Sequence, residues 1–293
     1  MLKIQEMNNA IYPCLWFDGN AKEAAEFYCS VFKNSKIVDD TPLVVTFELN
    51  GKLIMGLNGG PMFKFNPSIS LFVYCESIEE TNLVWAKLIE SGKELMPIDK
   101  YPWSERYGWL EDKFGFTWQI SVADTEEAKL KITPAMLFTG DQFGRAEEAI
   151  NFYSSVFENS ATDLLMHYEG NDPNEGKVLY SEFSLNHYSI IAMDGPGVHE
   201  YTFNEAVSFV VSCQTQEEID YYWSKLTEGG SEWQCGWLKD KFGVSWQIVP
   251  AVLFILMSDP SKSERVIKAF MQMKKFDIQK LVNDSLISYP CVD

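Results

Sequence analysis

The stretch that decides the fold is GWLEDKFGFTWQI at residues 108–120, because a second copy, GWLKDKFGVSWQI, occupies residues 236–248. Ten of the thirteen positions are identical, and the closing Trp-Gln-Ile keeps its place in both copies. The similarity continues upstream, where residues 11–35 match residues 132–160. A repeat with a period of about 125 residues predicts two tandem domains rather than a solenoid of short repeats.

The repeat also sets the domain boundaries that we predict. The acidic, polar stretch at residues 123–131 is expected to be an exposed linker between the copies. After the second copy the pattern changes, and amphipathic stretches at 263–275 and 277–283 predict two short helices. The predicted segments are a first domain at residues 8–124, a second domain at residues 131–252 and a helical C-terminal tail at residues 253–293.

Hydrophobic periodicity gives the same order of elements in each copy. In the first copy a short apolar strand at residues 11–17 leads into a segment at 20–33 with helical spacing of its apolar residues. Asn50-Gly51 then separates two strand-like stretches, which is typical of a two-residue hairpin turn. Strand, helix and several strands in succession predict an α+β fold, with helices on one face of mostly antiparallel sheets.

Net charge, the first ten residues and the cysteine spacing indicate which binding partners and which cellular compartment to expect. The formal net charge of −18 disfavours nucleic acid and anionic membrane surfaces, and it favours a cationic ligand over an anionic one. The first ten residues lack the basic start and apolar core of a signal peptide, so we expect a cytoplasmic protein. The six cysteines are scattered without a CxxC pair, which indicates buried thiols rather than a disulfide framework.

The motifs of common enzyme sites are absent from the sequence, since it holds no GxGxxG, GxSxG or HExxH. All three histidines fall in the second copy, so a repeated histidine-based metal site is excluded. The repeated polar residues that remain are Gln119 and Gln247. Alternation along the strand places Gln119 on the face opposite Trp118. An amide on that face either binds a ligand or satisfies a neighbouring backbone group, and both interpretations remain open.

Three groups of residues carry a resemblance to a known family: WFDGN with EFYCSVFKNS, the FELNG hairpin, and the GWL-DKFG--WQI ending. Together they resemble the PhnB-like branch of the glyoxalase/bleomycin-resistance superfamily, also called vicinal oxygen chelate (VOC). Members of this branch often carry the description 3-demethylubiquinone-9 3-methyltransferase. The resemblance covers residues 11–285 and implies paired βαβββ modules whose curled sheets form a cup for a substrate. It also implies an internal pseudo-dimer, so we expect a monomeric chain.

In active relatives the cup also holds a divalent metal, and the resemblance implies three ligand positions in each copy. Here those positions hold proline, serine and glutamine, which do not form a transition-metal site. We therefore expect no metal and no other cofactor. A methyltransferase is not expected either, because no glycine-rich loop joins a strand to a helix for an adenosyl cofactor. The three positions are Pro13, Ser70 and Gln119 in the first copy, and Pro134, Ser208 and Gln247 in the second.

Alternation along the strands predicts which side chains share the cup with these positions. The resulting faces are apolar and rich in aromatic residues, as small-molecule pockets are. The same side chains could instead fill the cup themselves. The predicted faces are Leu15, Phe17, Ser70, Phe72, Tyr74 and Gln119 in the first copy, and Met136, Phe138, Ser208, Val210, Ser212 and Gln247 in the second.

These observations predict a metal-free protein that binds or sequesters a small organic molecule, with no catalytic residue assigned. Two alternatives remain: a lyase-type or dioxygenase-type enzyme with an atypical metal site, and a structural protein whose cups are filled. A non-enzymatic role is favoured because no intact ligand set is visible. The predicted ligand-binding residues are Gln119, Gln247, Ser70, Ser208, Phe17, Phe72, Tyr74 and Phe138.

Overall fold

The computed structural model describes residues 11–125 and 131–286, so most of the predicted linker lies outside the described residues. The chain divides into a larger compact unit, Tyr12–Val207, and a smaller one formed by Met1–Ile11 and Ser208–Asp293. These units are not the two sequence repeats. The larger unit contains nearly all of the first repeat together with the first half of the second.

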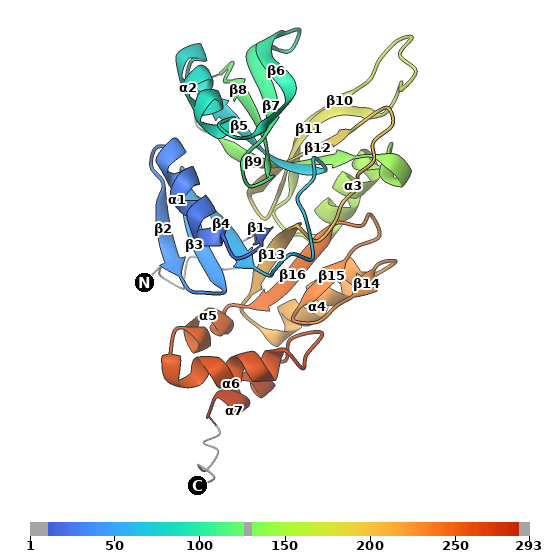
Figure 1. Cartoon of the computed structure of the whole chain (residues 1–293). Coiled ribbons are helices and arrows are strands. Elements are labelled where there is room, and N and C mark those ends of the chain that lie inside the picture. The colour runs from blue at the N-terminus through green and yellow to red at the C-terminus, as the bar shows by residue number, and fades with distance from the viewer. Residues whose placement is uncertain (1–10, 126–130, 287–293) are drawn as a thin grey trace. The chain divides into compact units, whose positions relative to one another are not determined.

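One arrangement, a strand, a helix and three more strands, occurs four times along the chain (Figure 1). In each module the first strand pairs in parallel with the last, and the other neighbours are antiparallel. The predicted α+β fold of paired βαβββ modules is therefore confirmed. In chain order the modules are β1 (Ile11–Phe17), α1 (Ala21–Val31), β2 (Lys36–Asp40), β3 (Val44–Leu49) and β4 (Lys52–Asn58); β5 (Ile69–Cys75), α2 (Ile78–Leu88), β6 (Lys93–Tyr101), β7 (Ser104–Glu111) and β8 (Thr117–Val122); β9 (Ile132–Phe138), α3 (Ala146–Val156), β10 (Ala161–His167), β11 (Val178–Leu185) and β12 (Tyr188–Asp194); and β13 (Val207–Cys213), α4 (Gln216–Thr227), β14 (Ser231–Glu232), β15 (Trp237–Lys239) and β16 (Ser245–Pro250).

The larger unit contains an eight-stranded sheet built from two different repeats. Its strand order is β10-β11-β12-β9-β5-β8-β7-β6. The central pair joins β5 of the first repeat to β9 of the second in antiparallel register, with Ser70 opposite Ala135. Helix α2 packs on β5, β7 and β8, and α3 packs on β11 and β12. The same unit holds β1, β4, β3 and β2, with α1 packed on the last three.

The smaller unit contains β13, β16, β15 and β14 with α4, and it ends in three helices. These are α5 (Val252–Met257), α6 (Pro260–Phe270) and α7 (Ile278–Leu286). The sequence pattern predicted two helices, at 263–275 and 277–283; α5 was not foreseen, and α6 begins and ends earlier than the pattern suggested. Strand β14 has two residues, whereas its counterpart β6 has nine, so the outer edge of this sheet is much shorter.

The repeated sequence stretch folds around one buried carboxylate. Asp112 Oδ1 accepts hydrogen bonds from the amides of Phe114 (2.8 Å) and Phe116 (3.1 Å), which form the turn between β7 and β8. Its Oδ2 accepts from Trp118 Nε1 at 2.8 Å and from the Tyr28 hydroxyl at 2.7 Å. Asp112 therefore joins the turn, the last strand and helix α1 through a single side chain.

The second copy repeats the turn with the same bonds. Asp240 Oδ1 accepts from Phe242 N at 2.8 Å and Val244 N at 3.1 Å, and Oδ2 accepts from Trp246 Nε1 at 2.8 Å. Gly243 has φ +85, a left-handed conformation that L-residues with a side chain rarely adopt. The shared letters of the two stretches thus encode a turn and a packed tryptophan.

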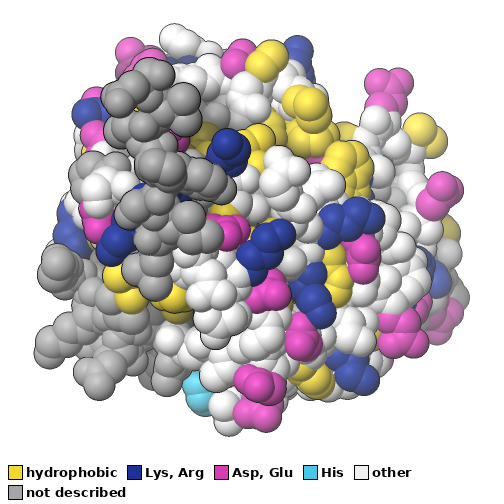
Figure 2. Space-filling model, turned by 90° about the horizontal axis from the view of Figure 1, so that it is seen from below, with side chains coloured by type: hydrophobic (Ala, Val, Ile, Leu, Met, Phe, Trp, Pro, Cys, Tyr) yellow, Lys and Arg dark blue, Asp and Glu magenta, His cyan; other side chains and the backbone are white. Residues whose placement is uncertain are grey.

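No helix in the described part of the chain combines the length and the apolar character needed to cross a bilayer. On the face shown in Figure 2, basic and acidic side chains lie interspersed with hydrophobic ones.

Candidate functional site

The glutamine of the first stretch is held between two side chains of its own sheet. Gln119 Nε2 donates to Ser70 Oγ at 2.9 Å, and Gln119 Oε1 accepts from the Tyr107 hydroxyl at 2.8 Å. All three residues are buried. In the first copy the amide thus satisfies neighbouring side chains, and the predicted pair Ser70 and Gln119 is brought together.

A row of four side chains crosses the eight-stranded sheet at Gln119. Strand register places Trp109 on β7 opposite Gln119, which lies beside Phe72 on β5, and Phe72 lies opposite Thr133 on β9. Phe72 and Trp109 of this row belong to an apolar cluster on the face away from α2 and α3, and we call this surface the aromatic face. Its members are Phe72, Tyr107, Ala135 and Ile191, with Tyr74, Met96, Tyr101, Trp109, Tyr180 and Met193 packed against them.

Side chains from distant strands meet on the aromatic face. Tyr74 lies on β5 and Tyr180 on β11, with β9 and β12 between them in the sheet. Three interstrand steps would separate these strands by about 14 Å if the sheet were flat. The two phenol oxygens nevertheless lie 2.5 Å apart, and the rings of Phe72 and Tyr180 have centroids 6.4 Å apart. Side chains of both repeats therefore meet on this one face.

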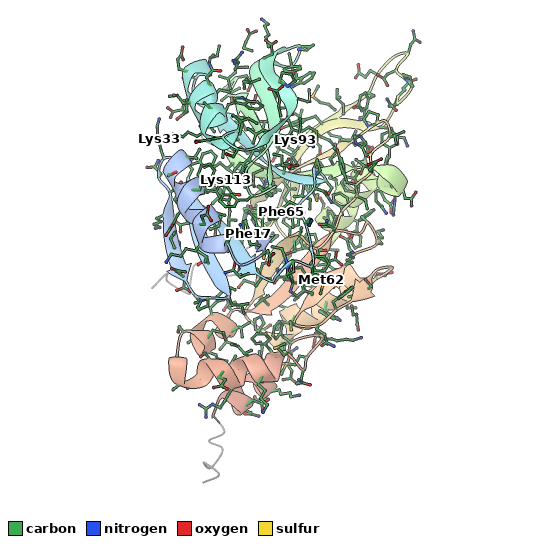
Figure 3. The ribbon with its side chains drawn as sticks, in the orientation of Figure 1. Phe17, Lys33, Met62, Phe65, Lys93 and Lys113 are labelled. Atoms are coloured by element: carbon green, nitrogen blue, oxygen red, sulfur yellow. The ribbon has the colours of Figure 1, made fainter. Side chains whose placement is uncertain are left out.

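Two of the predicted ligand-binding aromatic residues lie elsewhere. Phe17 packs edge to face against Phe65 at 5.3 Å (Figure 3), close to Ala21 at the start of α1. Phe138 is fully buried and contacts Phe203 at 5.0 Å. The prediction that Phe17 and Phe138 line the cup is wrong, because the alternation was assigned to the opposite face of the first strand in each repeat.

Strand register shows the reason for this error. Ala135 lies opposite Ser70 and therefore shares the aromatic face, so Pro134, Met136 and Phe138 point to the helix-covered side. Leu15 and Phe17 belong to β1, which is not a strand of the sheet that carries the aromatic face. The faces predicted for each copy therefore do not exist as single surfaces.

A charged network lies at the edge of the aromatic face. Glu182 Oε1 accepts from the Tyr180 hydroxyl at 2.7 Å and from the Tyr74 hydroxyl at 3.3 Å, and Oε2 accepts from Lys131 Nζ at 2.5 Å. Burial opposes ionisation of Glu182, but the bonds from Lys131 and Tyr180 outweigh it and hold the pKa of this carboxyl below its ordinary value. Burial raises the pKa of Tyr74 and of Tyr180, so both phenols stay protonated and can donate.

This network predicts a loss of stability in acid. Because the folded-state pKa of Glu182 is lowered, its contribution is complete above the unfolded value of about 4.3 and is lost as pH falls through the folded value. Denaturant unfolding of wild type and Glu182→Gln at several pH values measures this contribution. We expect the stability advantage of wild type to be constant above about pH 5 and to shrink below about pH 4. An advantage that does not change with pH would contradict the role of Glu182.

Two polar groups of the aromatic face lack partners. Trp109 Nε1 and Thr133 Oγ1 are buried atoms with no hydrogen-bond partner among the described residues. They lie at opposite ends of the row that contains Gln119 and Phe72. A buried donor left unsatisfied costs about 1–3 kcal/mol, so native proteins seldom retain one without a ligand or water that meets it.

The residues at the metal positions do not fit a divalent ion. Both ends of the Gln119 amide are engaged, and Pro134 offers no donor atom and points to the other side of the sheet. Within the described residues, His, Cys, Asp and Glu side chains form no group of three that could hold a metal. Ser70 is the only hydroxyl at these positions on the aromatic face, and a neutral hydroxyl is a poor ligand for a transition metal.

In the smaller unit, Gln247 keeps the bond to serine that Gln119 makes, but it has no counterpart of the bond from Tyr107. Gln247 Nε2 donates to Ser208 Oγ at 2.9 Å, so this predicted pair is also brought together. Cys235 occupies the position of Tyr107, and the Gln247 Oε1 atom has no hydrogen-bond partner among the described residues. The side chains beside Gln247 are smaller too, with Val210 and Ser212 in place of Phe72 and Tyr74.

The sequence analysis missed Glu182, Tyr180, Trp109 and Thr133. Tyr180 and Glu182 alternate on β11 and could have been assigned to one face. Their closeness to Tyr74 could not be read from the sequence, because it depends on pairing between repeats.

We compared the sequence and the fold of the chain with those of known proteins. The family model for 3-demethylubiquinone-9 3-methyltransferase matches residues 9–121 and again residues 130–249. No curated protein matches the chain. Among solved structures, a PhnB protein from Bacillus cereus with the same methyltransferase description is 39% identical over 38% of this chain and 98% of its own, with a TM-score of 0.36. Glyoxalase I from Zea mays is 12% identical over 84% of this chain and 95% of its own, with a TM-score of 0.55, which shows a shared fold.

Proposed function

Because the chain belongs to the PhnB-like family described as 3-demethylubiquinone-9 3-methyltransferase, within the VOC superfamily, we propose that it binds a small organic molecule on the aromatic face without a metal. The observation that carries the proposal is the pair of unpartnered buried groups, Trp109 Nε1 and Thr133 Oγ1, on an apolar, aromatic-rich surface. Ligand sites typically combine an apolar lining with a few such groups.

The chemistry of the face indicates the kind of ligand. The indole N–H of Trp109 can only donate, so the ligand needs an acceptor such as a carbonyl oxygen. The rings of Phe72, Tyr74 and Tyr107, with centroids 4.7 and 6.0 Å from Phe72, offer apolar and π surface to its body. A cationic group is favoured over an anionic one by these rings and by the net charge of −18.

Local structure argues against an adenosyl or nucleotide cofactor at the helix N-termini, where other folds bind such groups. Asn58 Oδ1 accepts from Ala21 N at 2.9 Å and so occupies the first turn of α1. Asp194 Oδ1 accepts from Gly144 N at 2.7 Å and from Ala146 N at 3.2 Å at the start of α3. Side chains of the protein thus already accept hydrogen bonds from the amides that a phosphate group would need at these two helix N-termini.

The test is a thermal-shift screen of small apolar molecules that carry a carbonyl, in ammonium-bearing and neutral pairs, followed by titration of the best compound. We expect Trp109→Phe and Thr133→Val to weaken binding about tenfold each, since each removes one hydrogen bond to the ligand. Trp233→Phe, an exposed tryptophan of the smaller unit, is the matched control and should bind as wild type does. Unchanged affinity in both site variants would contradict the proposal.

Metal analysis of the purified protein tests the proposal that binding needs no metal. Stoichiometric zinc, nickel, iron or manganese would contradict metal-free binding and favour an enzyme with an atypical ligand set. If no compound binds, and the Tyr74 and Tyr180 hydroxyls remain in contact, the aromatic face is a packed core with a structural role.

A further inference from the structure

The outer strand of the sheet is much shorter in the second repeat than in the first. Strand β7 pairs along its outer side with the nine-residue β6, whereas β15 pairs with the two-residue β14. The chain turns between β14 and β15, where Trp237 N donates to Gln234 O at 3.2 Å, so Cys235 and Gly236 lie in this turn. Their amides are not part of the β14–β15 ladder and can bond to another segment.

The C-terminal tail supplies acceptors for this turn. The amide of Cys235 donates to Met273 O at 2.8 Å, and the amide of Gly236 donates to Lys274 O at 2.7 Å. The acceptors lie in the segment between α6 and α7, residues 271–277, which we call the strap. The strap is thus bonded to the backbone of the turn that enters β15.

A glycine and an aromatic ring fix the strap in place. A Cβ atom on Gly236 would lie 2.5 Å from Phe276 Cε2 and 2.7 Å from Ile248 O, so no side chain fits there. Phe276 is 2% exposed and also contacts Phe270 of α6 at 6.1 Å. The ring therefore packs directly against the backbone of the sheet edge.

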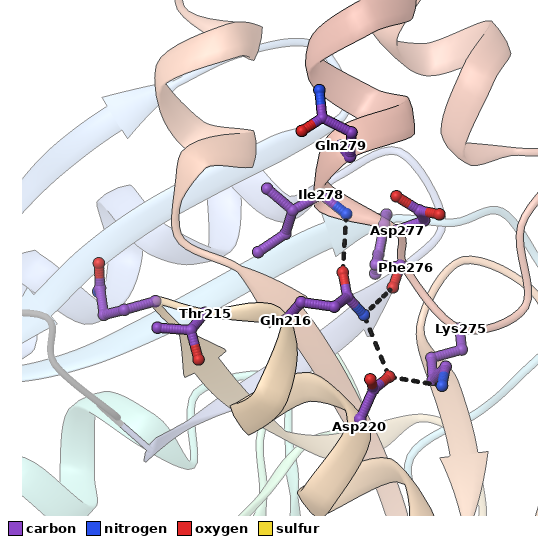
Figure 4. Close-up of a pocket in the computed structure, with 9 residues that line it drawn as sticks. Thr215, Gln216, Asp220, Lys275, Phe276, Asp277, Ile278 and Gln279 are labelled. Carbon is purple, nitrogen blue, oxygen red and sulfur yellow. Dashed lines mark hydrogen bonds and ion pairs between the residues drawn. The ribbon is translucent and has the colours of Figure 1, made fainter.

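Helix α4 holds the strap from the other side, around a pocket of about 630 Å³ (Figure 4). Gln216 donates through Nε2 to Phe276 O at 3.1 Å and accepts through Oε1 from Ile278 N at 2.9 Å. Lys275 Nζ lies 2.5 Å from Asp220 Oδ1, but both side chains are largely exposed, and such ion pairs contribute little. The attachment therefore depends on Gln216 and Phe276 rather than on charge.

The strap adjoins a turn with an unusual backbone. Cys235 has φ +60 and Gly236 has φ +79, so two consecutive residues of this turn are in left-handed conformations. Gly236 O accepts from Ile248 N at 2.8 Å, which ties the turn to β16. The first repeat has Tyr107 in a regular strand at the position of Cys235.

We propose that residues 271–277 form an intramolecular strap that packs on the turn before β15 and controls access to Cys235. Opening breaks two backbone bonds, the Gln216 bonds, two exposed ion pairs and the packing of Phe276 and Met273. These contacts all involve one short segment, so we expect a local event. This inference does not depend on ligand binding at the aromatic face, which is formed by other strands.

Thiol accessibility tests the strap in the full-length protein. The rate at which N-ethylmaleimide modifies Cys235, followed by peptide mass spectrometry, should rise about tenfold or more in Phe276→Ala and severalfold in Gln216→Ala. Gln279→Ala, which changes another residue of the same pocket, should leave the rate unchanged. Cys29, a partly exposed thiol of α1, serves as an internal reference and should react equally in all variants.

The outcomes separate local opening from general unfolding. Faster labelling of Cys235 with constant labelling of Cys29, together with faster amide exchange at Gly236, supports the strap. Unchanged labelling of Cys235 in both variants would overturn it. A parallel rise at Cys29 would also overturn it, because the variants would then loosen the whole protein rather than release one segment.

Discussion

Replacement of Asp112 by alanine is expected to lower the free energy of unfolding by about 4 kcal/mol, because it leaves four buried or partly buried donors without their acceptor. Burial raises the pKa of Asp112, so the charge itself is not a source of net stability. The loss comes from the hydroxyl of Tyr28, the indole of Trp118 and two turn amides.

Urea unfolding followed by circular dichroism measures this effect. Asp39→Ala, on the exposed strand β2, is the matched control and should change stability by less than about 0.5 kcal/mol. A loss of less than about 1 kcal/mol in Asp112→Ala would contradict the view that this carboxylate joins the turn, the strand and α1.

The second large effect is expected at a glycine that is exposed to solvent. A Cβ atom on Gly92, between α2 and β6, would overlap the carbonyl oxygen of Glu111 and lie 3.1 Å from Asp112 Cα. The backbone must move to accept it, so Gly92→Ala should cost about 3 kcal/mol. Gly230 meets the carbonyl of Lys239 in the same way, so Gly230→Ala should be comparably destabilising.

Thermal unfolding of the two variants checks this expectation, with Lys93→Ala, an exposed neighbour, as the control. Both glycine variants should unfold several degrees below wild type. If Gly92→Ala unfolds at the wild-type temperature, the contact between the α2–β6 connection and the β7 backbone is not tight.

Much of the fold could be predicted from the sequence because its signals are local. Asn50-Gly51 forms the expected turn between β3 and β4, with φ of +47 and +78, and the repeated stretches form the same turn. The period of the repeat gave four modules of the same order. These features depend on residues near one another in the chain.

The candidate site was predicted only in part, because its geometry depends on which strands pair. Gln119 and Ser70 were placed together correctly, since β5 and β8 belong to one module. Phe138 was assigned to the wrong face, because alternation divides a strand into two faces without showing which one the helices cover. The contact between Tyr74 and Tyr180 joins residues of different repeats, and no local pattern contains it.

The antiparallel pairing of β5 with β9 has a consequence for how the two repeats can change over time. Phe72 and Tyr74 have a neighbour, Tyr180, that is encoded in the other half of the gene. A substitution at Phe72 therefore alters the surroundings of Tyr180, more than a hundred positions away, as well as those of Tyr74. At these positions a change in one copy is expected to constrain which changes the other copy tolerates.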